Sequence, residues 1–171
     1  AISTTGLSGN NIVQIRTRRE ATGVDGCDYG EYITVSWSVN PLPNASITGT
    51  TSVCRNTPGP PITFTGSGGT PPYTFTYRIN GGGSQTITTT SGNSVTIQVP
   101  TNYDGVFTYE LISVQDGSST QCINSVNGTA IITVNQLPTP TINGTSTVCL
   151  GVPTVYTTEP GMNGYMWTVN G

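Results

Sequence analysis

The sequence predicts an all-β protein made of tandem immunoglobulin-like β-sandwich modules joined by Pro-containing linkers. Three observations lead to this fold class. Short segments alternate apolar and polar residues, pairs of turn-forming residues separate these segments, and one stretch of sequence recurs 95 residues further along the chain. No stretch of the 171 residues shows the period of an amphipathic helix.

The predicted strands follow one another at short intervals. Each has the period of two that turns one face toward a core, and Thr, with 32 of the 171 residues, occupies most of the polar faces. Thr is β-branched, so it favours strand conformation without adding charge. The clearest strands are 33–39, 75–79, 95–99, 108–114 and 131–134.

Turn signals separate these strands. Gly-Gly, Asn-Gly and Asp-Gly pairs supply the positive φ angles that tight turns require. Roughly seven short strands in about 95 residues, with turns every 8–12 residues, are typical of an immunoglobulin-like sandwich. The pairs are Gly68-Gly69, Asn80-Gly81, Asp104-Gly105 and Asp116-Gly117.

An internal repeat sets the domain organisation. Residues 40–54 recur as 135–149, and 8 of the 15 positions are identical. Both segments contain a Leu-Pro pair, at 42–43 and at 137–138. Because Pro fixes φ and favours an extended connection, we expect these pairs to mark the junctions between modules.

Three modules therefore share the chain. We expect 1–41 to be the C-terminal part of one immunoglobulin-like module, 42–136 to be a complete module, and 137–171 to be the N-terminal part of a further one. A weaker match between 75–81 and 165–171, which lie 90 residues apart, supports the third assignment. The chain reads as a segment of an array.

The composition excludes several classes of function. The chain has no His and no Lys, so it cannot form a Ser-His-Asp triad, a His-ligated zinc site or a P-loop. Only 8% of the residues are charged, and 5 Arg against 8 acidic residues give a net charge of −3, which disfavours nucleic-acid binding. No apolar run is long enough to span a membrane. We expect neither an enzyme nor a cofactor.

The four cysteines fit the repeat. Cys27 and Cys122 are 95 residues apart, as are Cys54 and Cys149. No Cys-x-x-Cys pair suggests zinc, so we predict that Cys54 and Cys122 form a disulfide within the complete module. Cys27 and Cys149 would then pair with cysteines outside this window. Disulfides form in oxidising compartments, so an extracellular or cell-surface location is expected.

Two segments resemble a known group of modules. The run Gly-Gly-Thr-Pro-Pro-Tyr-Thr-Phe-Thr-Tyr-Arg-Ile-Asn-Gly-Gly at 68–82 resembles the immunoglobulin-like repeats of giant Bacteroidota surface proteins. Residues 142–171 are similar to the opening of the PKD-like modules in the same proteins. The resemblance implies a gliding-adhesin-type protein exported by the type IX secretion system. It brings no catalytic motif with it.

Acidic residues are the first candidates for a binding or catalytic site. Asp25, Asp28 and Glu31 cluster in one loop, where oxygen ligands could hold Ca²⁺, although their spacing matches no defined calcium loop and a solvated turn is the simpler interpretation. We therefore expect no metal. Paired carboxylates can hydrolyse glycosides, and the acids of the complete module are Asp104, Glu110 and Asp116. The two Asp-Gly pairs read better as turns.

Aromatic residues are the second candidates. Tyr73 and Tyr103 could contact a glycan if they were exposed, whereas Phe75, Tyr77, Phe107 and Tyr109 are expected in the core. Trp37 and Trp167 lie on alternating segments and are expected to anchor cores.

The sequence as a whole predicts a non-enzymatic structural or adhesive segment of a long secreted surface protein, serving as a stalk or filament. Its partners would be neighbouring modules of the same chain. Low charge makes lateral self-association into a fibre plausible, because little repulsion opposes contact. The alternative is a set of accessory, carbohydrate-binding modules of a large secreted enzyme, with a surface glycan as ligand.

Overall fold

The computed structural model describes residues 5–7, 9–15 and 31–170, so the predictions for Asp25, Cys27 and Asp28 lie outside the described residues. The chain divides into two compact units, Ala1–Asn135 and Gln136–Gly171. Ten strands lie in the first unit, and the described residues contain no helix. No helix in this described part could therefore cross a membrane.

The strands of the first unit agree with the alternating segments and add several that the pattern did not single out. The predicted segments at 33–39, 75–79, 95–99, 108–114 and 131–134 coincide with or overlap β2, β6, β8, β9 and β10. The strands are β1 (Gly9–Ile15), β2 (Ile33–Val39), β3 (Asn44–Thr48), β4 (Thr51–Cys54), β5 (Pro61–Ser67), β6 (Thr74–Ile79), β7 (Gln85–Thr88), β8 (Ser94–Gln98), β9 (Gly105–Gln115) and β10 (Ile123–Asn135).

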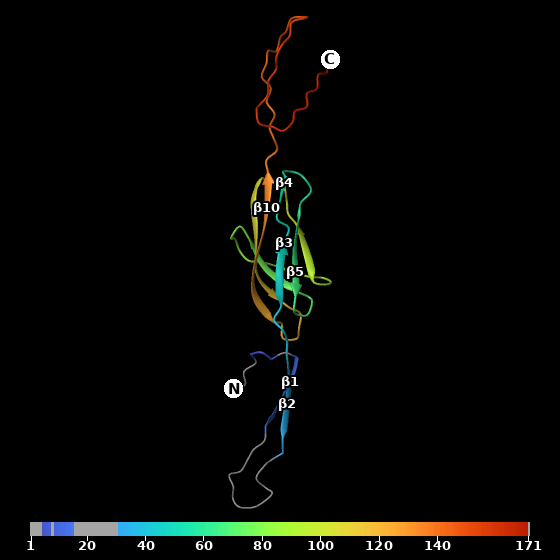
Figure 1. The fold of residues 1–171 in the computed structure, drawn as a ribbon, viewed down its shortest axis with the longest axis vertical. Helices are drawn as coiled ribbons and strands as arrows, with labels where there is room; N and C mark the ends of the chain where they lie inside the picture. The colour runs from blue at the N-terminus through green and yellow to red at the C-terminus, as the bar shows by residue number, and fades with distance from the viewer. Residues whose placement is uncertain (1–4, 8, 16–30, 171) are drawn as a thin grey trace, which may run out of the picture. The chain divides into compact units, whose positions relative to one another are not determined.

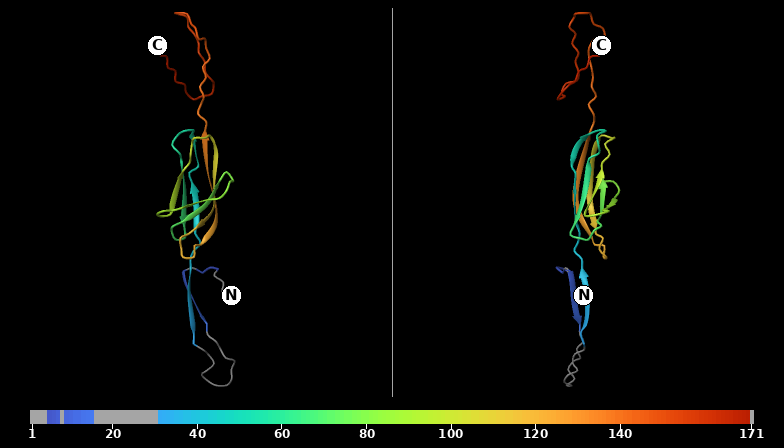
Figure 2. Two further views of the ribbon diagram at one scale, coloured as in Figure 1. Left: turned by 180° about the vertical axis from the view of Figure 1, so that it is seen from behind. Right: turned by 90° about the vertical axis from the view of Figure 1, so that its right-hand side faces the viewer.

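Strands β3 to β10 form an immunoglobulin-like sandwich, as the sequence predicts. One sheet has the order β4-β10-β9-β6-β7 and the other has the order β3-β5-β8. The two sheets face each other as layers (Figures 1 and 2). All pairings in them are antiparallel except that of β4 with β10, which is parallel.

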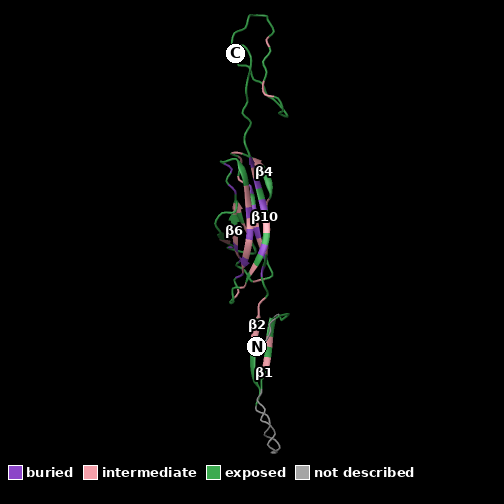
Figure 3. Cartoon of the chain, turned by 90° about the vertical axis from the view of Figure 1, so that its left-hand side faces the viewer, coloured by how far each residue is buried: buried purple, intermediate pink, exposed green. Residues whose placement is uncertain are grey.

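The core lies between these two sheets. Phe64 of β5 is fully buried, and its ring centroid lies 5.6 Å from that of Phe75 and 5.1 Å from that of Tyr77. Tyr109 of β9 continues the cluster at 6.2 Å from Tyr77. Figure 3 shows buried segments concentrated along the strands of the sandwich. The expectation that Phe75, Tyr77 and Tyr109 belong to the core is confirmed.

Thr residues cover the outward faces of the strands, as their alternation predicts. Hydroxyl pairs bridge neighbouring strands, with oxygens 3.1 Å apart between Thr63 and Thr96 and 2.9 Å apart between Thr74 and Thr88. Such cross-strand pairs add a few tenths of a kcal/mol each, up to about 1 kcal/mol. The outward faces are thus polar with few charges.

Strands β1 and β2 form a separate two-stranded antiparallel sheet. The described residues of the second unit, 136–170, include no extended strand. They contain one antiparallel bridge, in which the backbone groups of Asn143 and Thr157 exchange hydrogen bonds of 2.8 and 2.9 Å.

Candidate functional site: terminal strands and loop ends

The acidic residues of the sandwich do not form a catalytic pair. Asp104 and Asp116 flank the two ends of β9, which has 11 residues and therefore a length of about 35 Å. Glu110 lies midway and pairs with Arg78 of β6, while Asp104 lies 3.4 Å from Arg55. Asp104 and Glu110 thus each form an ion pair with a different arginine.

The described residues also contain no cluster of three metal-ligating side chains. Of the weak calcium candidates, Asp25 and Asp28 lie outside this region, and Glu31 is exposed.

The prediction that Tyr73 contacts a glycan is wrong. Its side chain is 1% exposed and its hydroxyl donates a 2.8 Å hydrogen bond to the carbonyl oxygen of Gly69. The reason is the direction of β6, which turns Phe75 and Tyr77 inward and carries Tyr73 with them. Tyr103, in contrast, is 69% exposed in the loop before β9.

The predicted Cys54–Cys122 disulfide is also wrong. Cys54, the last residue of β4, pairs with Asn135, the last residue of β10. Cys122 immediately precedes Ile123, the first residue of β10, and so lies at the opposite end of that strand. Thirteen residues of strand place the two cysteines about 40 Å apart, and a disulfide requires Cα atoms within about 7 Å. Both thiols are free. The repeat gave the spacing of the cysteines but not the direction in which each strand runs.

The two tryptophans differ from the core anchors that were expected. Trp37 is half-buried, and its indole nitrogen is buried without a hydrogen-bond partner among the described residues. Trp167 is 53% exposed, so its prediction as a core anchor does not hold in this structure. Cys149 is likewise exposed.

Asp116 instead organises the loops at one end of the sandwich. It is 3% exposed and accepts hydrogen bonds from Cys122 N at 2.9 Å, Ser118 Oγ at 2.8 Å and Thr70 N at 3.2 Å. Burial raises the pKa of Asp116, but these bonds outweigh it and hold the pKa below its ordinary value. The carboxylate therefore ties the β5–β6 loop to the β9–β10 loop.

The sequence placed Asp116 in a turn and missed this bracing role. The sequence shows only the Gly68-Gly69 pair, which also fits a turn, whereas in the structure a Cβ atom on Gly69 would lie 2.7 Å from Asp116 Oδ2. Only a residue without a side chain lets the backbone approach the carboxylate this closely.

The strands of the five-stranded sheet that come first and last along the chain, β4 and β10, form a parallel pair. Strand β4 lies against the C-terminal end of β10 in the register Thr51↔Ile132 to Cys54↔Asn135. Three further bonds continue this pairing, from Arg55 N to Asn135 O (2.8 Å), from Asn135 Nδ2 to Ser52 Oγ (2.7 Å) and from Ile131 N to Thr50 Oγ1 (3.1 Å). This pair joins the beginning of the sandwich to its end.

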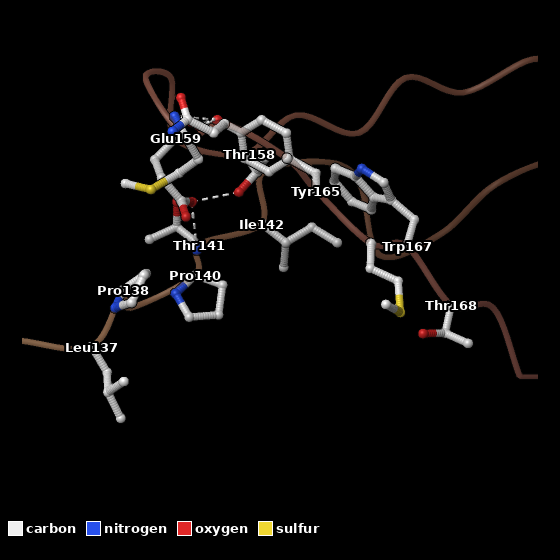
Figure 4. Close-up of a pocket in the computed structure, with 14 residues that line it drawn as sticks. Leu137, Pro138, Pro140, Thr141, Ile142, Thr158, Glu159, Tyr165, Trp167 and Thr168 are labelled. Atoms are coloured by element: carbon white, nitrogen blue, oxygen red, sulfur yellow. Dashed lines mark hydrogen bonds between the residues drawn. The ribbon is translucent and has the colours of Figure 1, made fainter. Parts of the chain in front are cut away.

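The second unit contains a cavity of about 910 Å³. Figure 4 shows Ile142, Tyr165 and Trp167 among its lining residues, beside the hydrogen-bonded group of Thr141, Thr158 and Glu159. Hydrogen bonds from the Thr158 hydroxyl and from the backbone N–H and hydroxyl of Thr141 lower the pKa of Glu159 to about 2. The other residues that line the cavity are largely apolar and are half exposed to solvent.

Comparisons with known proteins add one structural similarity. The chain matches no protein-family model and no curated protein. Among solved structures it is similar to the CARDB domain of the PF1109 protein from Pyrococcus furiosus, crystallised in complex with di-metal ions. The two share 15% identity and a TM-score of 0.34 over 57% of this chain and 96% of that one. The immunoglobulin-like assignment follows from the strand order and pairing of this chain itself.

Proposed function

We propose that this chain is a segment of a long extracellular surface protein, in which successive immunoglobulin-like modules form a stalk or filament. In this proposal 1–41, 42–136 and 137–171 belong to three consecutive modules. The modules carry tension along the chain and hold another part of the protein away from the cell.

The pairing of β1 with β2 supports the first boundary. Its seven residue pairs, from Gly9↔Val39 to Ile15↔Ile33, align with the pairs Gly105↔Val134 to Leu111↔Gly128 of β9 and β10 when β2 is shifted by 95 residues and β1 by 96. A second copy of the β9–β10 hairpin with one more residue between its paired segments would have this pairing.

The second unit supports the other boundary in the same way. Its bridge, Asn143↔Thr157, is the counterpart of the Thr48↔Thr63 pair that joins β3 to β5, with one residue fewer between the two bridged positions. The glycines that follow these positions differ: a Cβ atom on Gly144 would lie 2.1 Å from the ring of Tyr156, whereas one on Gly49 would lie 2.4 Å from the backbone oxygen of Pro61. The bridge is therefore the feature of the module opening that supports this boundary.

The parallel pairing of β4 with β10 is the observation that carries the mechanical role. Tension on a tandem array pulls Asn44 and Asn135 apart along the strands. Because β4 and β10 run in the same direction side by side, this pull loads their hydrogen bonds in shear. The bonds must then break together rather than one after another, which resists extension more strongly than unzipping does.

Single-molecule pulling on the chain tests this role. We expect one main event that releases about 280 Å of chain, the extended length of 44–135 less its folded length. Val53→Pro in β4 should lower the peak force, because Pro disrupts strand pairing.

Thr86→Pro is the matched control, since β7 is the other four-residue edge of the same sheet. It costs a similar free energy, about 1–3 kcal/mol, but carries no tension. Equal peak forces for the two variants would contradict the proposal.

The location, the partners and the Bacteroidota assignment rest on the resemblance alone, because the disulfide that favoured an oxidising compartment is not formed. Neighbouring modules are the proposed partners, and lateral association through the Thr-covered faces is a further one. Of the two tyrosines proposed for glycan contact in the carbohydrate-binding alternative, Tyr73 is buried and Tyr103 is exposed.

A further inference from the structure

Strand β8 forms one edge of the three-stranded sheet within the complete module. It is the yellow-green arrow beside β5 in Figure 1, and among the described residues β5 is the strand that pairs with it. The other side of β8 therefore presents backbone donors and acceptors that no described strand takes up. A sheet edge of this kind can add an extended strand from another molecule.

The hydrogen bonds to β5 show which residues of β8 turn their backbone toward this free side. Val99 N donates to Pro60 O at 3.0 Å, and Gly66 N donates to Asn93 O at 2.8 Å. Bonded positions alternate along an antiparallel pair, so the odd-numbered residues bond to β5 and the even-numbered ones direct their N–H and C=O groups away from it. These edge residues are Ser94, Thr96 and Gln98, and all of them are exposed.

Strand β8 lacks the features that normally prevent a sheet edge from pairing with another chain. Such features are charged side chains, Pro within the strand and β-bulges. The sequence has no charged residue between Arg78 and Asp104, Pro100 lies beyond the end of β8, and the register of β8 with β5 is continuous. A second strand can therefore approach this edge without charge repulsion.

We propose that β8 of one copy pairs with β8 of a second copy, antiparallel and about a twofold axis at Thr96. In this register Thr96 faces its own counterpart, and Ser94 faces Gln98 of the second copy. The facing edge residues exchange about six main-chain hydrogen bonds. This contact lies at a sheet edge and so goes beyond the proposed function, which places lateral association on the Thr-covered faces.

The side chains of β8 favour a second copy of the same strand as the occupant. On the inner face, Val95 comes to lie opposite Ile97 of the second copy, and both are half-buried apolar residues packed against the core. On the outer face, the hydroxyl oxygens of Thr63 and Thr96 lie 3.1 Å apart, and the Thr96 pair continues this row across the axis. An uncharged strand also needs no complementary charge on its partner.

The contact is isologous, so it closes at a dimer. Five residues of strand make a small interface, and a single pair of modules should therefore associate weakly. Several such edges along two arrays would act together, because each pairing raises the effective concentration of the next. This extension to whole arrays rests on the proposed function, whereas the dimer of the complete module does not.

Sedimentation velocity of the whole chain, over a concentration series up to about 1 mM, tests the dimer. Thr96→Lys and Thr96→Glu each set two like charges opposite each other at the axis, so each should weaken dimerisation about tenfold. Thr86→Lys and Thr86→Glu are the matched controls, because they change the net charge equally at an exposed position of β7. Both should dimerise like the original chain.

Mixing the two Thr96 variants gives the decisive result. Opposite charges then meet at the axis, so an equimolar mixture of Thr96→Lys and Thr96→Glu should dimerise more tightly than either variant alone. This recovery also shows that both variants are folded. A chain that stays monomeric, equal weakening by the Thr86 variants, or a mixture no more associated than its components would overturn the inference. None of these results affects the pulling test of the β4–β10 pair.

Discussion

Replacing Asp116 with Ala is expected to lower the free energy of unfolding of the sandwich by about 3 kcal/mol at neutral pH. The substitution leaves the backbone N–H groups of Thr70 and Cys122 without their acceptor at a part-buried site and removes the bond from the Ser118 hydroxyl. Hydrogen bonds to a charged group contribute about 1.5–3 kcal/mol each, and less where water can replace the partner. A domain of this size is stabilised by about 5–15 kcal/mol, so the loss is a large part of the total.

Urea denaturation at a series of pH values measures this effect. The pKa of Asp116 is lowered in the folded state, so its stabilisation is present above the unfolded pKa of about 3.9. It disappears as the pH falls through the lower folded pKa, and the difference between variant and original chain should shrink there.

Asp104→Ala is the control for Asp116, because the exposed pair of Asp104 with Arg55 contributes no more than about 1 kcal/mol. A loss at Asp116 no larger than that at Asp104 would show that the carboxylate is not the brace described here.

Replacing Phe64 with Ala is expected to destabilise the sandwich by about 3–5 kcal/mol. Phe64 is fully buried between the sheets and contacts the rings of both Phe75 and Tyr77. Its removal deletes apolar contacts and leaves a cavity that rigid strands on both sides cannot close. Thermal or urea unfolding, followed by the near-ultraviolet signal of the tyrosines, measures the loss.

Val106→Ala is the matched control for this core position. Val106 lies on the outward side of β9 and is 57% exposed, so its truncation should change the stability by less than about 0.5 kcal/mol. Similar losses at Phe64 and Val106 would contradict the assignment of the core to the space between the two sheets.

The sequence predicted the fold class because its strongest signals are local. Alternation in 108–114 and 131–134 identified strands that pair with each other and bury Tyr109 and Ile132. Strand β4 has four residues and a single half-buried apolar side chain, Val53, so its local pattern is weak. Its partner lies about 80 residues away, and such non-local pairing leaves no mark in the neighbouring sequence.

The same limit explains the errors at the candidate sites. A repeat gives the distance between Cys54 and Cys122 along the chain but not the end of the sandwich at which each one lies. Aromatic residues at 73, 75 and 77 share one face of β6, and the pattern alone could not separate the buried Tyr73 from an exposed one. Asp116 resembled a turn residue because two of its hydrogen-bond donors, Ser118 and Cys122, lie in the same loop, and the bond from Thr70 N joins it to a loop that is distant in sequence.

The central claim is that 137–171 begins another copy of the same module. The most direct measurement adds a second copy of residues 82–136 after Gly171, which corresponds to Gly81, so that the C-terminal unit gains every strand it lacks. With Trp37→Phe, Trp167 becomes the only tryptophan of the chain and reports on this unit alone. We predict that its emission shifts to the blue as the ring becomes buried, and that a second cooperative unfolding transition appears. A solvent-exposed Trp167 and a single transition would contradict the account.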